Sequence, residues 1–127
     1  MNTPSSLHYT QEHEWVRLRE DGETVVIGIT DYAQRELGDI VFVELEPEGD
    51  ELDREAVFGS VEAVKAVSEL FMPVSGTITA HNLTLESNPE LVNADPYGEG
   101  WMIEVALRDP SELDKLLSPE AYEAMTA

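Results

Sequence analysis

The chain lacks cysteine altogether. Without thiols it can form neither a disulfide nor a thiol nucleophile nor a cysteine-based zinc site, and the absence fits a reducing compartment. No segment approaches the ~20 consecutive apolar residues of a membrane-spanning helix. The opening stretch, MNTPSSLHYTQEHEW, has neither the basic and apolar regions of a secretory signal nor the Arg-rich character of a transit peptide. We therefore expect a soluble protein, cytoplasmic if its source is bacterial.

Basic residues are scarce as well. Seven lysines and arginines face 27 aspartates and glutamates, which gives a formal net charge of −20. Such a surface repels nucleic acid and anionic membranes and suits basic partners, although an ordinary solvated acidic surface is the simpler alternative. The 127 residues predict a single domain, and a hydrophobic fraction of 42% is enough for one compact core.

The motifs of common catalytic and metal sites are also missing. The three histidines, His8, His13 and His81, lie far apart, and there is no HExxH, GxSxG, P-loop or GxGxxG motif. The stretch GDELDRE lacks the ligand spacing of an EF-hand. Neighbouring carboxylates such as Asp50 and Glu51 are expected to be solvated loop charges, because a glycosidase pair needs a defined spatial gap. The sequence therefore argues against an independent enzyme and against a metal site.

Short strands separated by turn signals account for the first half of the chain. HEWVRLRE and ETVVIGIT flank Asp21-Gly22, a typical hairpin signal. Thr30 can cap a helix over DYAQREL that Gly38 ends, and DIVFVEL follows as a third strand. The polar stretch EPEGDELD predicts a surface loop.

The second half continues the pattern. Val57, Gly59, Val61 and Ala63 recur with period 2, which predicts two strands meeting in a tight hairpin around Val64-Lys65, before a turn at PVSG. WMIEVAL predicts the last strand. The remaining signals predict helix starts: Asn88 as N-cap with Pro89 first in the helix, Ser111 with Asp114 as a capping pair, and Ser118-Pro119-Glu120.

Together these elements predict a mostly β fold, a small barrel or sandwich with helices at one end. We expect a flexible tail over residues 1–8 and one domain over residues 9–127, with helices from about residue 111 onward.

Lys65 is the residue that this pattern leaves unexplained. It is one of two lysines in the chain, and in GSVEAVKAVSEL it lies among small and β-branched residues at the predicted hairpin tip. The simplest interpretation is a surface charge that protects a sheet edge. The alternative is attachment, because a lysine amine, with an ordinary pKa of ~10.4, can be acylated once an enzyme removes its proton. A rigid, accessible tip suits a tethered prosthetic group that swings between partners.

Blocks along nearly the whole chain carry a family resemblance. YTQEHEWV, VVIGITDYAQRELGDIVFVELEPEG, GSVEAVKAVSEL, PVSGTI, NPELVNADPYGEGWM and the helical tail, from about Tyr9 to Tyr122, together resemble the H proteins of the glycine cleavage system. The resemblance implies a lipoyl-type barrel-sandwich hybrid with short helices and a C-terminal helical tail. It also implies that Lys65 carries one covalent lipoic acid as N6-lipoyllysine.

The resemblance further implies a role and its partners. A carrier of this family shuttles the aminomethyl group of glycine from the pyridoxal-phosphate decarboxylase, the P protein, to the aminomethyltransferase, the T protein, which uses tetrahydrofolate. Dihydrolipoyl dehydrogenase, the flavin-dependent L protein, reoxidises it, and a lipoylating enzyme attaches the cofactor. The carrier itself would be a non-catalytic monomer, since the redox chemistry belongs to the cofactor and needs no cysteine of the chain.

A cleft for the loaded arm is also implied by the resemblance. Glu14 matches a cleft position, and Glu69, four residues after Lys65, is a second candidate, because a carboxylate can hold an ammonium by a charge-assisted hydrogen bond. Glu12 departs from the small polar residue expected before HEW; facing solvent is the favoured expectation, and adding charge to the cleft is the alternative. Glu62 is expected to help the lipoylating enzyme recognise the hairpin.

Two other swinging-arm classes fit less well. Val64 and Ala66 flank the lysine where a biotin carrier usually has methionines. A lipoyl domain of a 2-oxoacid dehydrogenase usually has Asp before its lysine and belongs to a multidomain chain. An H-protein-like lipoyl relay or binding module that is not active in glycine cleavage stays open, because the same lysine motif would serve it.

Overall fold

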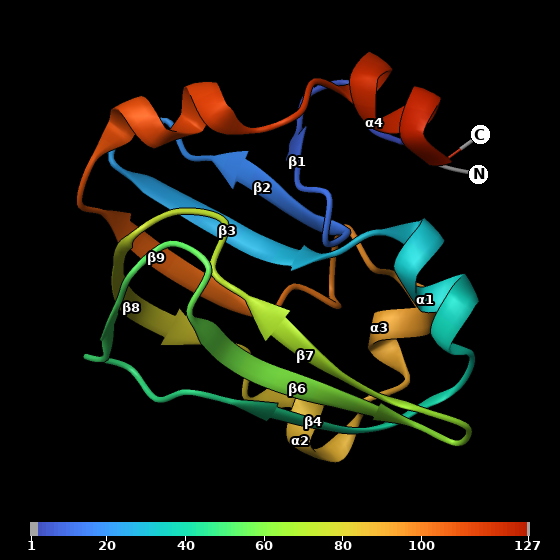
Figure 1. The fold of residues 1–127 in the computed structure, drawn as a ribbon. Coiled ribbons are helices and arrows are strands. Elements are labelled where there is room, and N and C mark those ends of the chain that lie inside the picture. Colours follow the sequence, from blue (N-terminus) through green and yellow to red (C-terminus); the bar gives the residue numbers. More distant parts are fainter. Residues whose placement is uncertain (1–2, 127) are drawn as a thin grey trace.

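The computed structural model describes residues 3–126 as two antiparallel β-sheets with short helices around them (Figure 1). The larger sheet has the order β1-β2-β3-β9-β8-β5 and contains β1 (His8–Tyr9), β2 (Glu14–Leu18), β3 (Thr24–Ile29), β9 (Ile103–Leu107), β8 (Gly76–His81) and β5 (Glu51–Leu52). The smaller sheet has the order β4-β6-β7 and contains β4 (Ile40–Leu45), β6 (Val57–Ala63) and β7 (Val67–Phe71). The helices are α1 (Asp31–Leu37), α2 (Thr84–Ser87), α3 (Leu91–Ala94), the 3-10 helix η1 (Pro110–Lys115) and α4 (Pro119–Thr126). The mostly β fold class is confirmed.

One apolar core joins the two sheets. Ile27 of β3, Val43 of β4 and Val61 of β6 are buried in the same cluster. A second cluster lies on the other face of the larger sheet, where the rings of Tyr9 and Tyr122 stack with their centroids 4.7 Å apart. Helix α4 therefore packs beside β1. Trp15 and Val16, adjacent in β2, are buried in different clusters on opposite faces of the sheet.

Local sequence signals produce the elements that they predict in the first half. The Asp21 carboxylate accepts hydrogen bonds from the N–H groups of Glu23 and Thr24 and closes the β2–β3 hairpin. The Thr30 hydroxyl oxygen accepts from the Ala33 N–H at the start of α1. Gly38 ends this helix with a φ of 82°, a left-handed value that favours glycine.

Two predicted caps are wrong. Helix α3 begins at Leu91, with Glu90 rather than Asn88 at its N-cap and with no side-chain hydrogen bond at that cap; Asn88 instead ends α2 by donating its N–H to the Thr84 carbonyl. The 3-10 helix η1 is capped by Asp109 instead of Ser111. Asp109 lies directly before the proline that opens the helix, and its carboxylate accepts a hydrogen bond from the Ser111 N–H.

Three stretches hold more structure than their composition indicates. The expected surface loop EPEGDELD contains β5, which pairs with β8. Leu7 is buried and His8 begins β1, inside the expected tail. The PVSG turn is buried, and the Glu112 carboxylate accepts from both the N–H and the hydroxyl of Ser75. Within residues 3–126 no helix has the length and apolar character needed to cross a membrane.

The contact between Gly28 and Trp15 generates a stability prediction. A Cβ at Gly28 would come within 2.7 Å of the Trp15 ring, which is fully buried and donates its Nε1–H to the Pro96 carbonyl at 2.9 Å. Gly28→Ala is expected to lower the free energy of unfolding by about 1–3 kcal/mol, measured by urea titration.

Gly22→Asn is the control for this prediction. A Cβ at Gly22 meets nothing within 4 Å, and its φ of 71° is one that asparagine tolerates. We expect it to cost less than about 1 kcal/mol. Equal losses in the two variants would contradict the packing argument.

Candidate functional site

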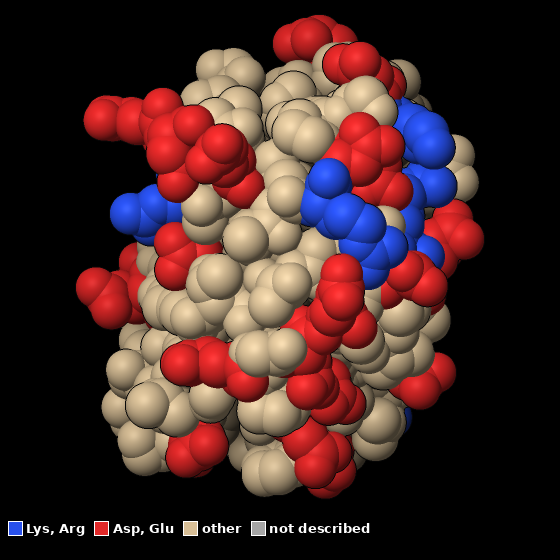
Figure 2. Space-filling view, turned by 90° about the vertical axis from the view of Figure 1, so that its left-hand side faces the viewer, with Lys and Arg blue, Asp and Glu red and all other residues tan. Residues whose placement is uncertain are grey.

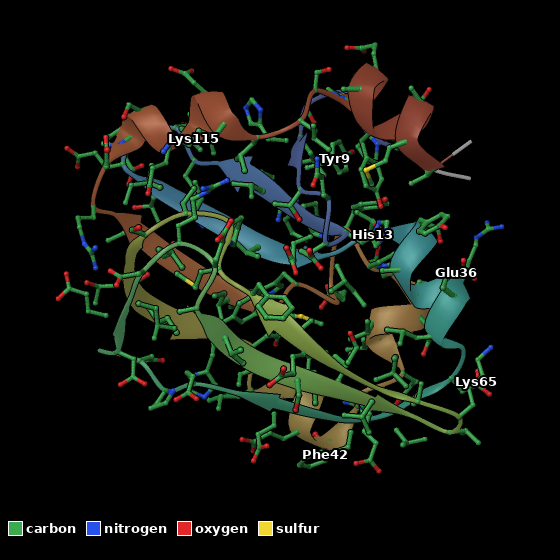
Figure 3. All side chains as sticks on the ribbon, in the orientation of Figure 1. Tyr9, His13, Glu36, Phe42, Lys65 and Lys115 are labelled. Atoms are coloured by element: carbon green, nitrogen blue, oxygen red, sulfur yellow. The ribbon has the colours of Figure 1, made fainter. Side chains whose placement is uncertain are left out.

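Lys65 lies at the tip of the hairpin formed by β6 and β7 (Figure 3). The Ala63 N–H donates to the Ala66 carbonyl at 2.7 Å across this tip, and Glu62 pairs with Val67 just before it. The lysine side chain is exposed. Lys65 is therefore exposed to solvent at the end of the hairpin, just beyond the point where β4 stops pairing with β6 at Ala63.

Contacts outside the hairpin fasten its tip. The Val64 N–H donates to the Asp39 carbonyl at 3.1 Å, which joins the tip to the turn between α1 and β4. Asn93 of α3 holds that turn in place, because its Oδ1 accepts from the Ile40 N–H and its Nδ2 donates to the Gly38 carbonyl, both at 2.8 Å. The position of the tip is therefore determined by residues far away in sequence.

The side chain of Lys65 extends over Gly38. A Cβ at Gly38 would lie 3.4 Å from the lysine Cε, so the missing side chain leaves room for the lysine stem. A glycine at this turn thus both permits the left-handed backbone and makes space for Lys65.

A hollow of about 240 Å³ lies between α1 and β7. Its apolar lining comes from Ile29, Ala33, Leu37 and Leu70, and its acidic lining from Glu12, Glu36 and Glu69. His13, Glu36 and Lys65 follow one another down the same side of the molecule (Figure 3). An apolar chain that ends in a cation suits such a hollow, because the walls are hydrophobic and the charges are negative.

His13 and Tyr32 complete the wall of this hollow. Their rings lie 4.7 Å apart, and His13 Nδ1 is 2.8 Å from the Tyr122 hydroxyl, which is 2.7 Å from the Thr30 hydroxyl. Burial lowers the pKa of His13. Helix α4 therefore supports the hollow through Tyr122. The sequence carries no signal for this contact, because 109 residues separate the two side chains.

Glu14 is buried, with 2% of its surface exposed. One carboxylate oxygen accepts from the Thr10 hydroxyl at 2.6 Å, and the other accepts from the Phe71 N–H at 3.3 Å. Burial raises the pKa of Glu14 to about 7, while these two hydrogen bonds act in the opposite direction. Glu14 lines a second hollow of about 210 Å³, and the exposed Glu12 lines both hollows.

The structure brings together only some of the residues expected at the site. Glu12 and Glu69 meet at the first hollow, while Glu14 lies in the neighbouring one and Glu62 is exposed on β6, paired with Val67. Glu69 follows Lys65 by four residues along the hairpin, about 13 Å at ~3.3 Å per residue. In the described part of the chain no group of three His, Asp or Glu side chains could hold a metal ion.

Positive charge gathers away from the lysine tip. Figure 2 shows the side of the molecule opposite the tip, with Lys and Arg side chains in its upper half and acidic side chains over the whole face. Several of the arginines are engaged by carboxylates, as Arg108 is by Asp53 at 2.7 Å and Arg19 by Glu104 at 3.4 Å. Their charge is therefore partly neutralised within the molecule.

Comparisons with known proteins all identify the same family over nearly the whole chain. The family model described as glycine cleavage H-protein matches residues 7–127. The glycine cleavage system H protein of Salinibacter ruber is 60% identical over 99% of this chain and 100% of its own length. That of Geobacillus kaustophilus is 59% identical over 98% and 97%. A crystal structure of a glycine cleavage system H protein from Mycobacterium marinum superposes with a TM-score of 0.83 at 34% identity, over 95% of this chain and 96% of that one.

Burial of Glu14 generates a pH prediction. Its pKa in the folded protein is about 7, against an ordinary 4.5, so folding favours the protonated carboxyl. The resulting stabilisation is fully present below the ordinary pKa and is lost as the pH rises through about 7. We expect the free energy of unfolding of the wild type to fall by up to about 3 kcal/mol between about pH 4.5 and ~8 because of this group.

Glu14→Gln removes the titrating group and keeps the side-chain size. In urea titrations its stability relative to the wild type should therefore increase as the pH rises over the same range. Glu69→Gln, which removes an exposed carboxylate on β7, controls for the loss of one negative charge. Parallel pH profiles for the wild type and Glu14→Gln would contradict the burial argument.

Proposed function

The chain belongs to the glycine cleavage H-protein family, and on this premise we propose that it is a lipoyl carrier of glycine cleavage with the cofactor attached to Lys65. The observation that carries the assignment to Lys65 is its position, exposed at a hairpin tip that Asp39 and Asn93 fasten from outside. The other lysine, Lys115, lies in the helix η1 and not at a hairpin tip.

The residues around Lys65 fit a lipoyl group. The amine is exposed, and the adjacent hollow offers apolar walls to a hydrocarbon chain and carboxylates to an amine at its end. Four residues separate Glu69 from Lys65, at most about 13 Å of chain, a span that a lysine stem lengthened by an octanoyl-sized chain covers. When bound, lipoate supplies a disulfide that accepts the aminomethyl group and is restored by oxidation of the dithiol.

The carboxylates of the chain would shelter the aminomethyl ammonium. We assign Glu69 and Glu12 to the hollow beside α1, where both line the wall, and Glu14 to the neighbouring hollow that Glu12 also borders. An ammonium close to Glu14 would favour its ionised form and so lower a pKa that burial has raised. The buried carboxylate would thus become charged when a cation arrives.

The partners follow from this role. We propose that the chain receives the aminomethyl group at the P protein, delivers it at the T protein and is reoxidised at the L protein, after a lipoylating enzyme has modified Lys65. The acidic surface suits basic rims on these partners, and Glu62, exposed next to the tip, is placed to contact the lipoylating enzyme.

Attachment at Lys65 is testable by intact-mass measurement after incubation with lipoate, ATP and a purified lipoate–protein ligase. The wild type is expected to gain one lipoyl group. Lys65→Arg should gain none, because a guanidinium keeps the charge but is not acylated. Lys115→Arg, the only other lysine replaced in the same way, should behave like the wild type. A lipoyl mass on Lys65→Arg, or none on the wild type, would refute the assignment.

Shelter by Glu14 is testable through the non-enzymatic loss of the aminomethyl group from loaded protein. Glu14→Gln is expected to lose the group about tenfold faster near pH 8, corresponding to ~1.4 kcal/mol, because an uncharged amide holds an ammonium less strongly. The ratio of the two rates should fall toward one well below pH 7, where Glu14 of the wild type is protonated as well.

Glu20→Gln, an exposed carboxylate next to the β2–β3 hairpin, is the control and should leave the rate unchanged. A pH-independent ratio, or equal rates for Glu14→Gln and the wild type, would refute the role of Glu14. A chain that is lipoylated but is not loaded by the P protein would indicate the relay function instead.

A further inference from the structure

The outer face of the smaller sheet exposes large apolar side chains beside Lys65. Phe42 of β4 pairs with Glu62 of β6, which pairs with Val67 of β7, so the three side chains form one row across the sheet. The relative exposure is 50% for Phe42, 67% for Val67 and 77% for Val64 at the adjoining tip. We call the two apolar members of this row, Phe42 and Val67, together with Val64 at the tip, the apolar row.

Backbone geometry keeps the apolar row out of the core. The next row inward, Val43 and Val61, is buried, and a register shift between Ile40 and Phe42 interrupts the alternation of β4. As a result, two consecutive apolar residues, Val41 and Phe42, are 48% and 50% exposed. In a chain with 27 acidic residues, apolar side chains gathered at the end of a hairpin indicate a contact surface more than an accident of composition.

A hollow lined by carboxylates borders the apolar row. Glu44, Ser60 and Glu69 form the neighbouring row of the same face and line a space of about 330 Å³. The small side chain of Ser60 and the absence of one at Gly59 leave this space open, and a Cβ at Gly59 would collide with the Glu44 carbonyl oxygen. A partner that matches both features presents an apolar patch next to a basic side chain.

The reach of Lys65 decides which partner this is. An unmodified lysine stem spans about 6 Å, so the enzyme that acylates its amine has to contact the surface immediately around the tip. Partners that act later meet the cofactor at the end of a longer arm, and contact with the same surface is not required of them. Figure 3 shows Phe42 and Lys65 at the outer edge of the molecule, on β4 and at the tip of the neighbouring hairpin.

We propose that the apolar row, together with the hollow between Glu44 and Glu69, is the docking surface for the enzyme that lipoylates Lys65. This inference rests on the proposed function. The enzyme's facing surface is apolar, with a basic side chain that enters the hollow. Glu62, which lies between Phe42 and Val67 across the sheet, adds a charge that fixes the orientation of the hairpin.

The test compares the lipoylation kinetics of unmodified variants, with intact mass as the readout. Val64→Thr/Val67→Thr and Phe42→Thr replace the apolar surface by residues of good strand propensity, so the hairpin is retained. We expect kcat/KM to fall at least tenfold, mainly through a higher KM, and the direct Kd of the unmodified chain for the ligase to weaken by the same factor. Leu18→Thr, at an exposed strand position of the larger sheet, should stay within about twofold of the wild type.

The outcomes separate this inference from the proposed function. If the wild type gains no lipoyl mass, the proposed function fails. If the wild type is lipoylated and the variants match it, only the docking surface is refuted. Variants lipoylated to completion with excess ligase should then support glycine decarboxylation by the P protein at wild-type rates. A loss there as large as the loss with the ligase would assign the surface to the later partner and overturn the proposal.

Discussion

The hydrogen bond from the Val64 N–H to the Asp39 carbonyl is the contact on which the site depends. Strand β4 supports the β6–β7 hairpin by pairing with β6 as far as Ala63, so only the residues at the tip need contacts of their own. The tip is attached to the turn after α1, and Asn93 attaches that turn to α3. The lysine therefore has a defined position relative to α1, and the hollow between α1 and β7 lies beside the hairpin that this contact holds.

Glu14 shows how the protein balances a cost at this site. A carboxylate removed from water raises the free energy of the folded state unless it is protonated or hydrogen-bonded. The Thr10 hydroxyl and the Phe71 N–H offset part of that cost, and the remaining penalty appears as a pKa of about 7. A group held at this balance responds to a nearby positive charge, which suits a pocket that receives a cation only during part of a reaction cycle.

The local elements that sequence predicts well are those whose signals act over a few residues. The Asp21-Gly22 hairpin, the Thr30 cap with Gly38 at the end of α1, and the alternation of β6 each depend on contacts within one turn or one strand. The predicted caps at Asn88 and Ser111 are wrong because each residue lies at a different position relative to the neighbouring helix than its sequence signal indicates. Asn88 is the C-cap residue of the preceding helix, and Asp109 lies before the proline that starts η1 whereas Ser111 already lies inside that helix. An N-cap residue acts through its side-chain oxygen, and whether that oxygen reaches the first turn of a helix depends on the backbone around it.

By itself, the sequence determined the mostly β architecture and the hairpin with Lys65 at its tip, because periodicity and turn residues are local properties, while the acidic candidates for a cleft came from the family resemblance. Only the tertiary structure decided that Glu12 and Glu69 share one hollow while Glu14 is buried in the next. It also decided that Tyr122 supports His13, and that Phe42 lies in a row with Val67. These relations depend on strand register and on contacts between residues distant in the chain, which a single sequence does not encode position by position.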